Sequence, residues 1–256
     1  MVRRMPEIFI IGIMKGGTTI LYDYLCTHPR VVPGASKEIH YFSLYSDRGP
    51  EWYLSHFPER GERFLSIDAS PTYFDVAYTP AIPGFIKSAV PNAKVILIIR
   101  DPVERAVSHF NHLKLVSYKD SFKDIDINEF FSRSLEGCYS KKTPYDEHLN
   151  NILLFSLYYH KFLWYTQVFG RANVMVLTST ELDTNPTETM QRIFKYCGLE
   201  WVPSSLFGVH RYVSDSDVSN LKASVRERLA RLLYPDFKNF CLAAGLLYPQ
   251  KSDYVC

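Results

Sequence analysis

The sequence has few cysteines and no motif that would pair them. Five occur among 256 residues, an odd number, and no two are spaced as C-x-x-C. This pattern excludes a disulfide framework and a cysteine-based zinc site, and it is typical of proteins in a reducing compartment. We therefore expect a cytoplasmic protein without a metal.

Long apolar runs and an excess of one charge are also lacking. No run reaches the ~18 apolar residues of a membrane-spanning helix, and residues 7–13 are too short for a signal peptide. The formal net charge is only +2, so the composition gives no sign of a nucleic-acid partner. We expect no membrane segment in this chain, although a catalytic domain excised from a membrane-anchored parent would have the same features.

What the chain does contain is the composition of a globular protein. Hydrophobic residues make up 46% of the sequence, enough to bury a core. The length fits one large domain over residues 1–256. The 18 tyrosines and 17 phenylalanines fit either an aromatic core or a lined cleft.

Short apolar runs alternate with stretches of helical spacing. Strands are expected over 8–13, 64–69, 94–100 and 173–177, and helices over 18–27, 102–115, 152–169, 186–197 and 221–233. The alternation predicts an α/β fold of three layers, with a central parallel sheet covered by helices on both faces. Ligands bind at the carboxyl ends of strands in such sheets, so the loops after positions 13, 69 and 99 are the places to look.

A glycine-rich loop joins the first expected strand to the first expected helix. Gly16 and Gly17 allow a tight turn and a close approach to a ligand. The helix N-terminus that follows offers N–H groups to a phosphate. Lys15 adds a positive charge, and Thr18 and Thr19 add hydroxyl donors. The segment predicts a P-loop-like phosphate-binding strand–loop–helix.

This loop departs from the common nucleotide-binding motif G-x-x-x-x-G-K-S/T. Gly12 and Gly17 match the two glycines, but Thr18 stands in place of the lysine, which lies at Lys15 instead. The departure argues against a standard NTPase. A P-loop-type kinase or NTPase stays open as an alternative, because the strand that ends before Asp101 has the form of a Walker B strand.

Four segments in chain order match the motifs of one family. They are KGGTT at 15–19, KEIHYF at 37–42, SPTYF at 70–74 and IRDPVERAVS at 99–108. Together they resemble sulfotransferases that use 3′-phosphoadenosine 5′-phosphosulfate (PAPS), closest to the heparan sulfate 3-O-sulfotransferases and bacterial sulfotransferases. The resemblance covers most of the chain. It implies a PAPS-dependent sulfotransferase that releases 3′-phosphoadenosine 5′-phosphate (PAP).

The resemblance also implies which residues hold the cofactor. The 5′-phosphosulfate would lie on the KGGTT loop, and the 3′-phosphate would be bound by an arginine and a serine of the fourth segment. Arg211 is a candidate for the basic role of a C-terminal Lys-Gly-Arg loop that this chain lacks. The expected cofactor-binding residues are Lys15, Gly16, Gly17, Thr18, Thr19, Arg100, Ser108 and Arg211.

Sulfuryl transfer needs a base for the acceptor and charge stabilisation for the leaving phosphate, because the group moves in line between two oxygens. Glu38 is the expected base, on condition that partial burial raises its pKa toward neutrality. Lys15 would stabilise the charge on departing PAP. His40 would lie on the same face as Glu38 in an extended segment, where it could orient the acceptor or hydrogen-bond Glu38.

One departure from the family bears on the acceptor. Ala69 stands where the glycosaminoglycan enzymes carry a lysine before Thr-Pro. With the near-neutral charge, this favours a small-molecule natural product over a carbohydrate, with a hydroxyl or an amine as the sulfated group. A glycosaminoglycan sulfotransferase stays open, and so does a non-catalytic nucleotide- or carbohydrate-binding protein on the same fold.

Overall fold

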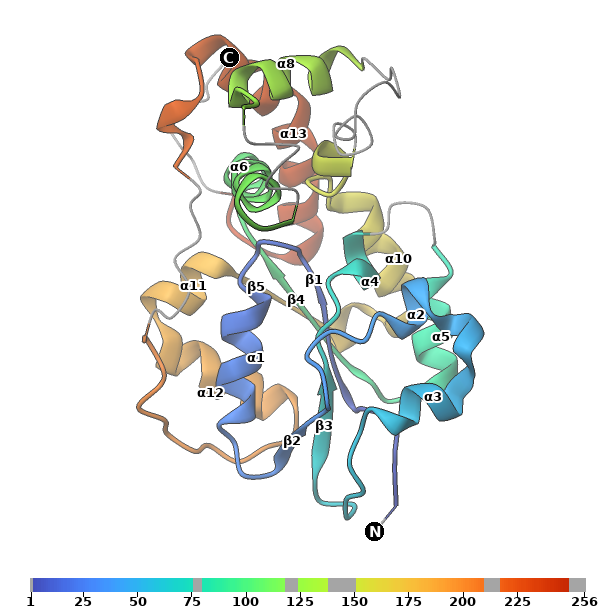
Figure 1. The fold of residues 1–256 in the computed structure, drawn as a ribbon. Coiled ribbons are helices and arrows are strands. Elements are labelled where there is room, and N and C mark those ends of the chain that lie inside the picture. Colours follow the sequence, from blue (N-terminus) through green and yellow to red (C-terminus); the bar gives the residue numbers. More distant parts are fainter. Residues whose placement is uncertain (1, 76–79, 118–123, 138–150, 210–216, 249–256) are drawn as a thin grey trace. The chain divides into compact units, whose positions relative to one another are not determined.

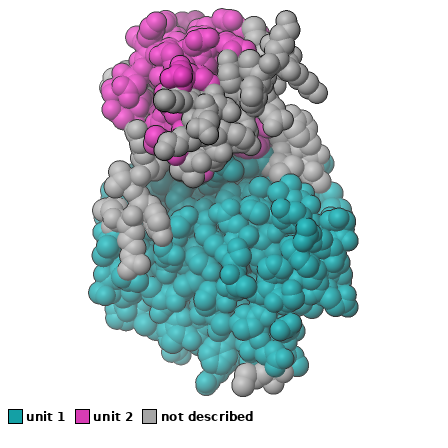
Figure 2. Space-filling view, viewed as in Figure 1, with its two compact units in different colours: residues 1–100, 163–213 teal, residues 101–162, 214–256 magenta. Residues whose placement is uncertain are grey.

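The computed structural model describes residues 2–75, 80–117, 124–137, 151–209 and 217–248. The chain divides into two compact units. Unit 1 comprises Met1–Arg100 and Leu163–Val213, and unit 2 comprises Asp101–Phe162 and Ser214–Cys256 (Figure 2). The expectation of one domain over residues 1–256 stays a prediction.

Unit 1 is built on a sheet of five strands in the order β2-β3-β1-β4-β5 (Figure 1). Every neighbouring pair is parallel. The strands are β1 (Ile8–Gly12), β2 (Val31–Pro33), β3 (Leu65–Asp68), β4 (Lys94–Ile99) and β5 (Val174–Thr178). The predicted α/β fold with a central parallel sheet is confirmed.

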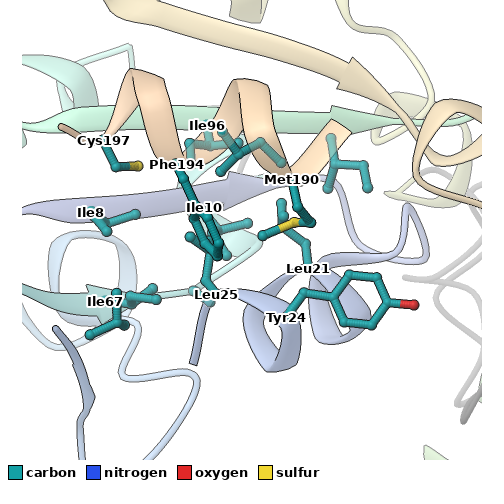
Figure 3. Close-up of a cluster of buried hydrophobic side chains, with 14 of the residues drawn as sticks. Ile8, Ile10, Leu21, Tyr24, Leu25, Ile67, Ile96, Met190, Phe194 and Cys197 are labelled. Atoms are coloured by element: carbon teal, nitrogen blue, oxygen red, sulfur yellow. The ribbon is translucent and has the colours of Figure 1, made fainter. Parts of the chain in front are cut away.

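Helices cover both faces of this sheet, and the side chains of β1 show why. Ile8 and Ile10 pack in one core with residues of α1 (Thr18–Cys26) and α12 (Pro186–Tyr196) (Figure 3). Phe9, between them, faces the opposite side, where its ring centroid lies 6.0 Å from that of Phe42. Successive strand residues point to opposite faces. Because both faces are buried, the strand is a continuous apolar run.

Short helices connect the strands of unit 1. Those that the structure describes are α2 (Tyr41–Leu44), η1 (Ser46–Arg48), α3 (Gly49–Ser55), α4 (Thr72–Asp75), α5 (Ile82–Ala89), η3 (Arg171–Asn173) and α11 (Ser179–Thr184). The edge strand β2 has only three residues. Its brevity is why the apolar pattern did not predict it.

Unit 2 is helical in its described part. It contains α6 (Pro102–His112) with a π-helical turn η2 (Leu113–Ser117), α8 (Ile127–Glu136), η4 (Val218–Asn220) and α13 (Ala223–Ala244). Helix α13 packs against α6 and α8. No helix among the described residues is long and apolar enough to cross a membrane.

The helix expected over 152–169 is interrupted: residues 151–154 are helical, and residues 155–158 are not. Regular helix α10 begins at Tyr159 and ends at Phe169. The carboxylate of Asp236, far along the chain, accepts hydrogen bonds from the backbone N–H groups of Tyr158 at 2.5 Å and Tyr159 at 3.1 Å. These bonds satisfy N–H groups that a helix leaves unpaired at its start, so the new helix begins there.

Candidate functional site

The glycine loop, residues 13–17, turns tightly between β1 and α1. The N–H of Ile13 donates to the carbonyl of Ile98 in β4 at 2.8 Å, and the N–H of Gly16 donates to the carbonyl of Ile13 at 2.9 Å. Lys15 and Gly17 have left-handed backbones, with φ of 66° and 102°. A Cβ on Gly16 would lie 2.9 Å from the carbonyl oxygen of Ile98. The close packing of backbone on backbone therefore requires glycine at position 16.

We expect Gly16→Ala to lower the free energy of unfolding by ~1–3 kcal/mol, because the added methyl forces the loop away from β4. Gly84→Ala is the matched control. A Cβ at Gly84, inside α5, meets no atom of the described structure within 4 Å. Alanine there should raise the stability by ~0.5–1 kcal/mol through helix propensity. Urea unfolding of both variants measures the difference, and equal stabilities would contradict the tight turn.

Lys15 of this loop has two cationic neighbours, Arg100 and Lys37. Burial lowers the pKa of Lys15 from its usual 10.5, and the charges of Arg100 and Lys37 lower it further. The Nζ of Lys37 also donates to the Thr18 hydroxyl at 3.3 Å. Gly17, the N-cap of α1, has no side chain to satisfy the N–H groups of the first helical turn. These positive charges repel one another beside the positive end of the helix dipole, so a bound anion would stabilise the arrangement.

Glu38 lies beside these cations. One carboxylate oxygen accepts from Lys37 Nζ at 2.5 Å, and the other lies 3.4 Å from His40 Nε2. Burial raises the pKa of Glu38, but hydrogen bonds from His40 and Lys37 and their charges outweigh it, so the pKa lies below its usual 4.5. The expected rise of this pKa toward neutrality is wrong, because the expectation considered burial alone and not the lowering of the pKa by the hydrogen bonds from His40 and Lys37.

His40 reaches Glu38 by a different backbone path from the expected one. Its φ is 56°, left-handed rather than extended. Its Nδ1 lies 2.8 Å from the Thr72 hydroxyl of α4. From the same helix, the carboxylate of Asp75 accepts from the N–H of Met14 in the glycine loop at 2.7 Å. Helix α4 therefore contacts both the glycine loop and the base segment, by which we mean residues 37–40.

The remaining predicted site residues are placed as follows. Thr19 is the second residue of α1 and is half-buried. Arg100 follows β4 directly and is half-buried. Ser108 lies in α6 of unit 2 and is buried. Arg211 lies outside the described residues. The joint binding of a 3′-phosphate by Arg100 and Ser108 stays a prediction.

Sequence reasoning did not assign a role to Lys37. The carbonyl of Lys37 accepts from the N–H of Ala69 at 3.0 Å, which places Lys37 beside the position where the expected lysine is missing. Its ammonium group bridges Glu38 and Thr18. The available signal was the lysine itself, which begins the matched segment 37–42.

The hydrogen-bond partners of Asp101 argue against the kinase alternative. One carboxylate oxygen accepts from the N–H groups of Val103 at 3.0 Å and Glu104 at 3.1 Å, as the N-cap of α6. The other accepts from the Tyr234 hydroxyl at 3.0 Å. A Walker B aspartate would instead be directed at a Mg²⁺ ion. Within the described part of the chain, no group of three or more His, Cys, Asp or Glu could hold a metal ion.

Several characterised proteins are similar to this chain. It is 28% identical over 215 residues to the bifunctional heparan sulfate N-deacetylase/N-sulfotransferase 1 of Caenorhabditis briggsae, covering 78% of the chain and 23% of that protein. It is 35% identical over 108 residues to the human heparan sulfate glucosamine 3-O-sulfotransferase 6, covering 42% of the chain and 30% of that protein. The chain thus spans about a quarter of the length of these relatives.

The fold has a solved counterpart as well. The crystal structure of a sulfotransferase from Alicyclobacillus acidocaldarius matches with a TM-score of 0.73 at 23% identity, over 95% of this chain and 97% of that one. The family model for the sulfotransferase domain matches residues 5–232. Because the family model covers most of the chain, the chain belongs to the sulfotransferase family.

Proposed function

We propose that the protein transfers a sulfuryl group from PAPS to a hydroxyl or amine, with Glu38 as the base. One observation carries the proposal: the charges of Arg100 and Lys37 act on Lys15 of the glycine loop, while Glu38 contacts Lys37. An anion site and a carboxylate base are therefore neighbours within one unit.

The donor would be held by its two anionic ends. Lys15 and the N–H groups of Gly16, Gly17, Thr18 and Thr19 would bind the 5′-phosphosulfate, as helix N-termini bind phosphates. At the other end of the nucleotide, the 3′-phosphate would be bound by Arg100 with Ser108, and Arg211 would add a further cation. An arginine can grip a phosphate through two parallel hydrogen bonds.

Transfer would follow an in-line path. The acceptor oxygen or nitrogen attacks the sulfur while Glu38 takes its proton, and the bond from sulfur to the phosphate oxygen breaks. The leaving PAP gains the negative charge, which Lys15 stabilises. The lowered pKa keeps the Glu38 carboxylate ionised at neutral pH, so the group can accept a proton, as a weaker base than the raised pKa expected from the sequence would give. His40 orients the acceptor.

The proposed acceptor is a small-molecule natural product, because Ala69 replaces the lysine of the glycosaminoglycan enzymes. A carbohydrate is the second candidate, since the relatives named above act on heparan sulfate by their names. Turnover of PAPS with hydroxylated and amine metabolites, and separately with desulfated glycans, distinguishes the two. The acceptor that gives the higher kcat/KM identifies the class.

PAPS turnover in excess EDTA tests the proposed reaction. We expect sulfuryl transfer to continue undiminished, because lysines and N–H groups rather than a metal stabilise the transferred charge. PAP at 100 times its Kd should raise the stability by ~2.7 kcal/mol in a thermal-shift measurement. Turnover of ATP that depends on Mg²⁺, without any turnover of PAPS, would support a kinase instead.

A further inference from the structure

We propose that Ser70, oriented by Asp68, is a positioning residue that holds the base segment in its active geometry. The proposal deepens the proposed function and rests on it, because the segment matters through Glu38 and His40. Ser70 and Asp68 lie at the carboxyl end of β3, about thirty residues along the chain from the segment that they hold.

The Ser70 hydroxyl uses every hydrogen bond that it can make. It donates to Asp68 Oδ1 at 2.6 Å. It accepts from the N–H groups of Ile39 at 3.0 Å and His40 at 2.9 Å. A hydroxyl has one proton and two lone pairs. Since Asp68 takes the proton, both lone pairs are directed at the backbone that follows Glu38.

Asp68 is itself fixed in one orientation. Its Oδ2 accepts from the hydroxyls of Tyr53 at 2.8 Å and Tyr73 at 2.6 Å, and its side chain is fully buried. Burial raises the pKa of Asp68, and the hydroxyls of Ser70, Tyr73 and Tyr53 offset part of that rise. In its carboxylate form Asp68 accepts from all three hydroxyls.

The base segment needs such a support because its backbone is strained. His40 has a left-handed φ of 56°, which costs a residue other than glycine ~1–3 kcal/mol. The bond from its N–H to Ser70, with the contact from its ring to Thr72, holds this conformation. Without the Ser70 hydroxyl, the N–H groups of buried Ile39 and half-buried His40 lose their acceptor, and the segment is free to relax. Glu38 would then move with it.

Three variants separate positioning from general stability. Ser70→Ala removes the hydroxyl, and Ser70→Thr keeps it, as in the Thr-Pro segment of the resembled enzymes. Ser66→Ala is the matched control, because Ser66 lies in β3, the strand that leads to Ser70, is equally buried, and its Oγ has no partner among the described residues. All three are compared with the wild-type protein at matched stability, checked by thermal unfolding.

We expect Ser70→Ala to lower kcat by ~10–100-fold, since a misplaced catalytic group costs up to about two orders of magnitude. The Kd for PAP, measured by calorimetry, should change less than about twofold, because the Ser70 hydroxyl bonds to Asp68, Ile39 and His40 rather than to the glycine loop. Backbone amide exchange at Ile39 and His40 should accelerate. Ser70→Thr should restore kcat, and Ser66→Ala should leave all three quantities unchanged.

Other outcomes overturn the proposal. An unchanged kcat in Ser70→Ala means that the base segment does not need this bond. Equal losses of kcat and PAP affinity, or a loss in Ser66→Ala as large as in Ser70→Ala, mean that the hydroxyl only stabilises the fold. Failure of the wild-type protein to bind PAP or turn over PAPS would refute the proposed function, while amide exchange would still test the Ser70 contact on its own.

Discussion

Glu38→Gln should bind PAP as tightly as the wild-type protein and transfer sulfuryl groups ~10²–10⁴-fold more slowly. The amide has the shape of the carboxylate, so it keeps one acceptor for Lys37 or His40, the two groups within 3.4 Å. It cannot accept a proton from the acceptor. Calorimetry with PAP and steady-state transfer rates measure the two quantities separately.

Glu62→Gln is the control for a general loss of charge. Glu62 is also a carboxylate with a lowered pKa, because of a hydrogen bond from Arg4 and the charge of that residue. Its substitution should leave both PAP affinity and transfer unchanged. If Glu38→Gln transfers as fast as Glu62→Gln, another group is the base.

The pH dependence of kcat/KM tests the direction in which the pKa of Glu38 is shifted. The pKa of Glu38 lies below 4.5, so its carboxylate is protonated only as the pH falls through that lowered value. The acid side of kcat/KM, which reports the free enzyme, should therefore stay level between pH 8 and about pH 5. A decline of kcat/KM between pH 7 and pH 6 that Glu38→Gln abolishes would contradict the lowered pKa.

Lys15→Met should weaken PAP binding by ~10–100-fold, the loss expected for a charged hydrogen-bond donor worth ~1.5–3 kcal/mol. The same change should stabilise the unliganded protein at neutral pH. Lys15 is charged there although burial and the charges of Arg100 and Lys37 disfavour its charge. Methionine fills a similar space without the charge and accepts the same left-handed backbone at the same strain.

The sign of the stability effect follows from proton binding. The folded pKa of Lys15 lies below its usual 10.5, so between the two values the unfolded chain binds more protons than the folded one. The wild-type protein should gain stability as the pH rises through this window, and the advantage of Lys15→Met should shrink. Urea unfolding at several pH values measures this convergence.

Lys195→Met is the matched control, because Lys195 lies on the exposed side of α12. It should change neither PAP affinity nor the pH dependence of stability. If unliganded Lys15→Met is less stable than Lys195→Met, then Lys15 stabilises the fold of the loop, which would contradict its proposed role as a cation placed to bind an anion.

The apolar pattern was sufficient to predict the sheet. The run from Lys94 to Ile99 is buried from Val95 onward, and the glycines correctly predicted a loop directly after the strand Ile8–Gly12. These features are local, because burial on both faces leaves a continuous apolar run and a sharp turn requires glycine.

Features that depend on distant residues could not be predicted in this way. Asp236 sets the start of α10 from about eighty residues away. The pKa of Glu38 depends on how Lys37 and His40 are folded back onto it. The support from Ser70 joins segments about thirty residues apart. Such contacts arise from tertiary packing. The spacing of residues along the chain does not predict them.

A crystal structure of the protein with PAP tests the central claim most directly. We predict the 5′-phosphate on the N–H groups of residues 16–19 with Lys15 beside it, and the 3′-phosphate within hydrogen-bonding distance of Arg100. A nucleotide that binds away from residues 15–19, or that reaches this loop with its 3′-phosphate far from Arg100, would contradict the account.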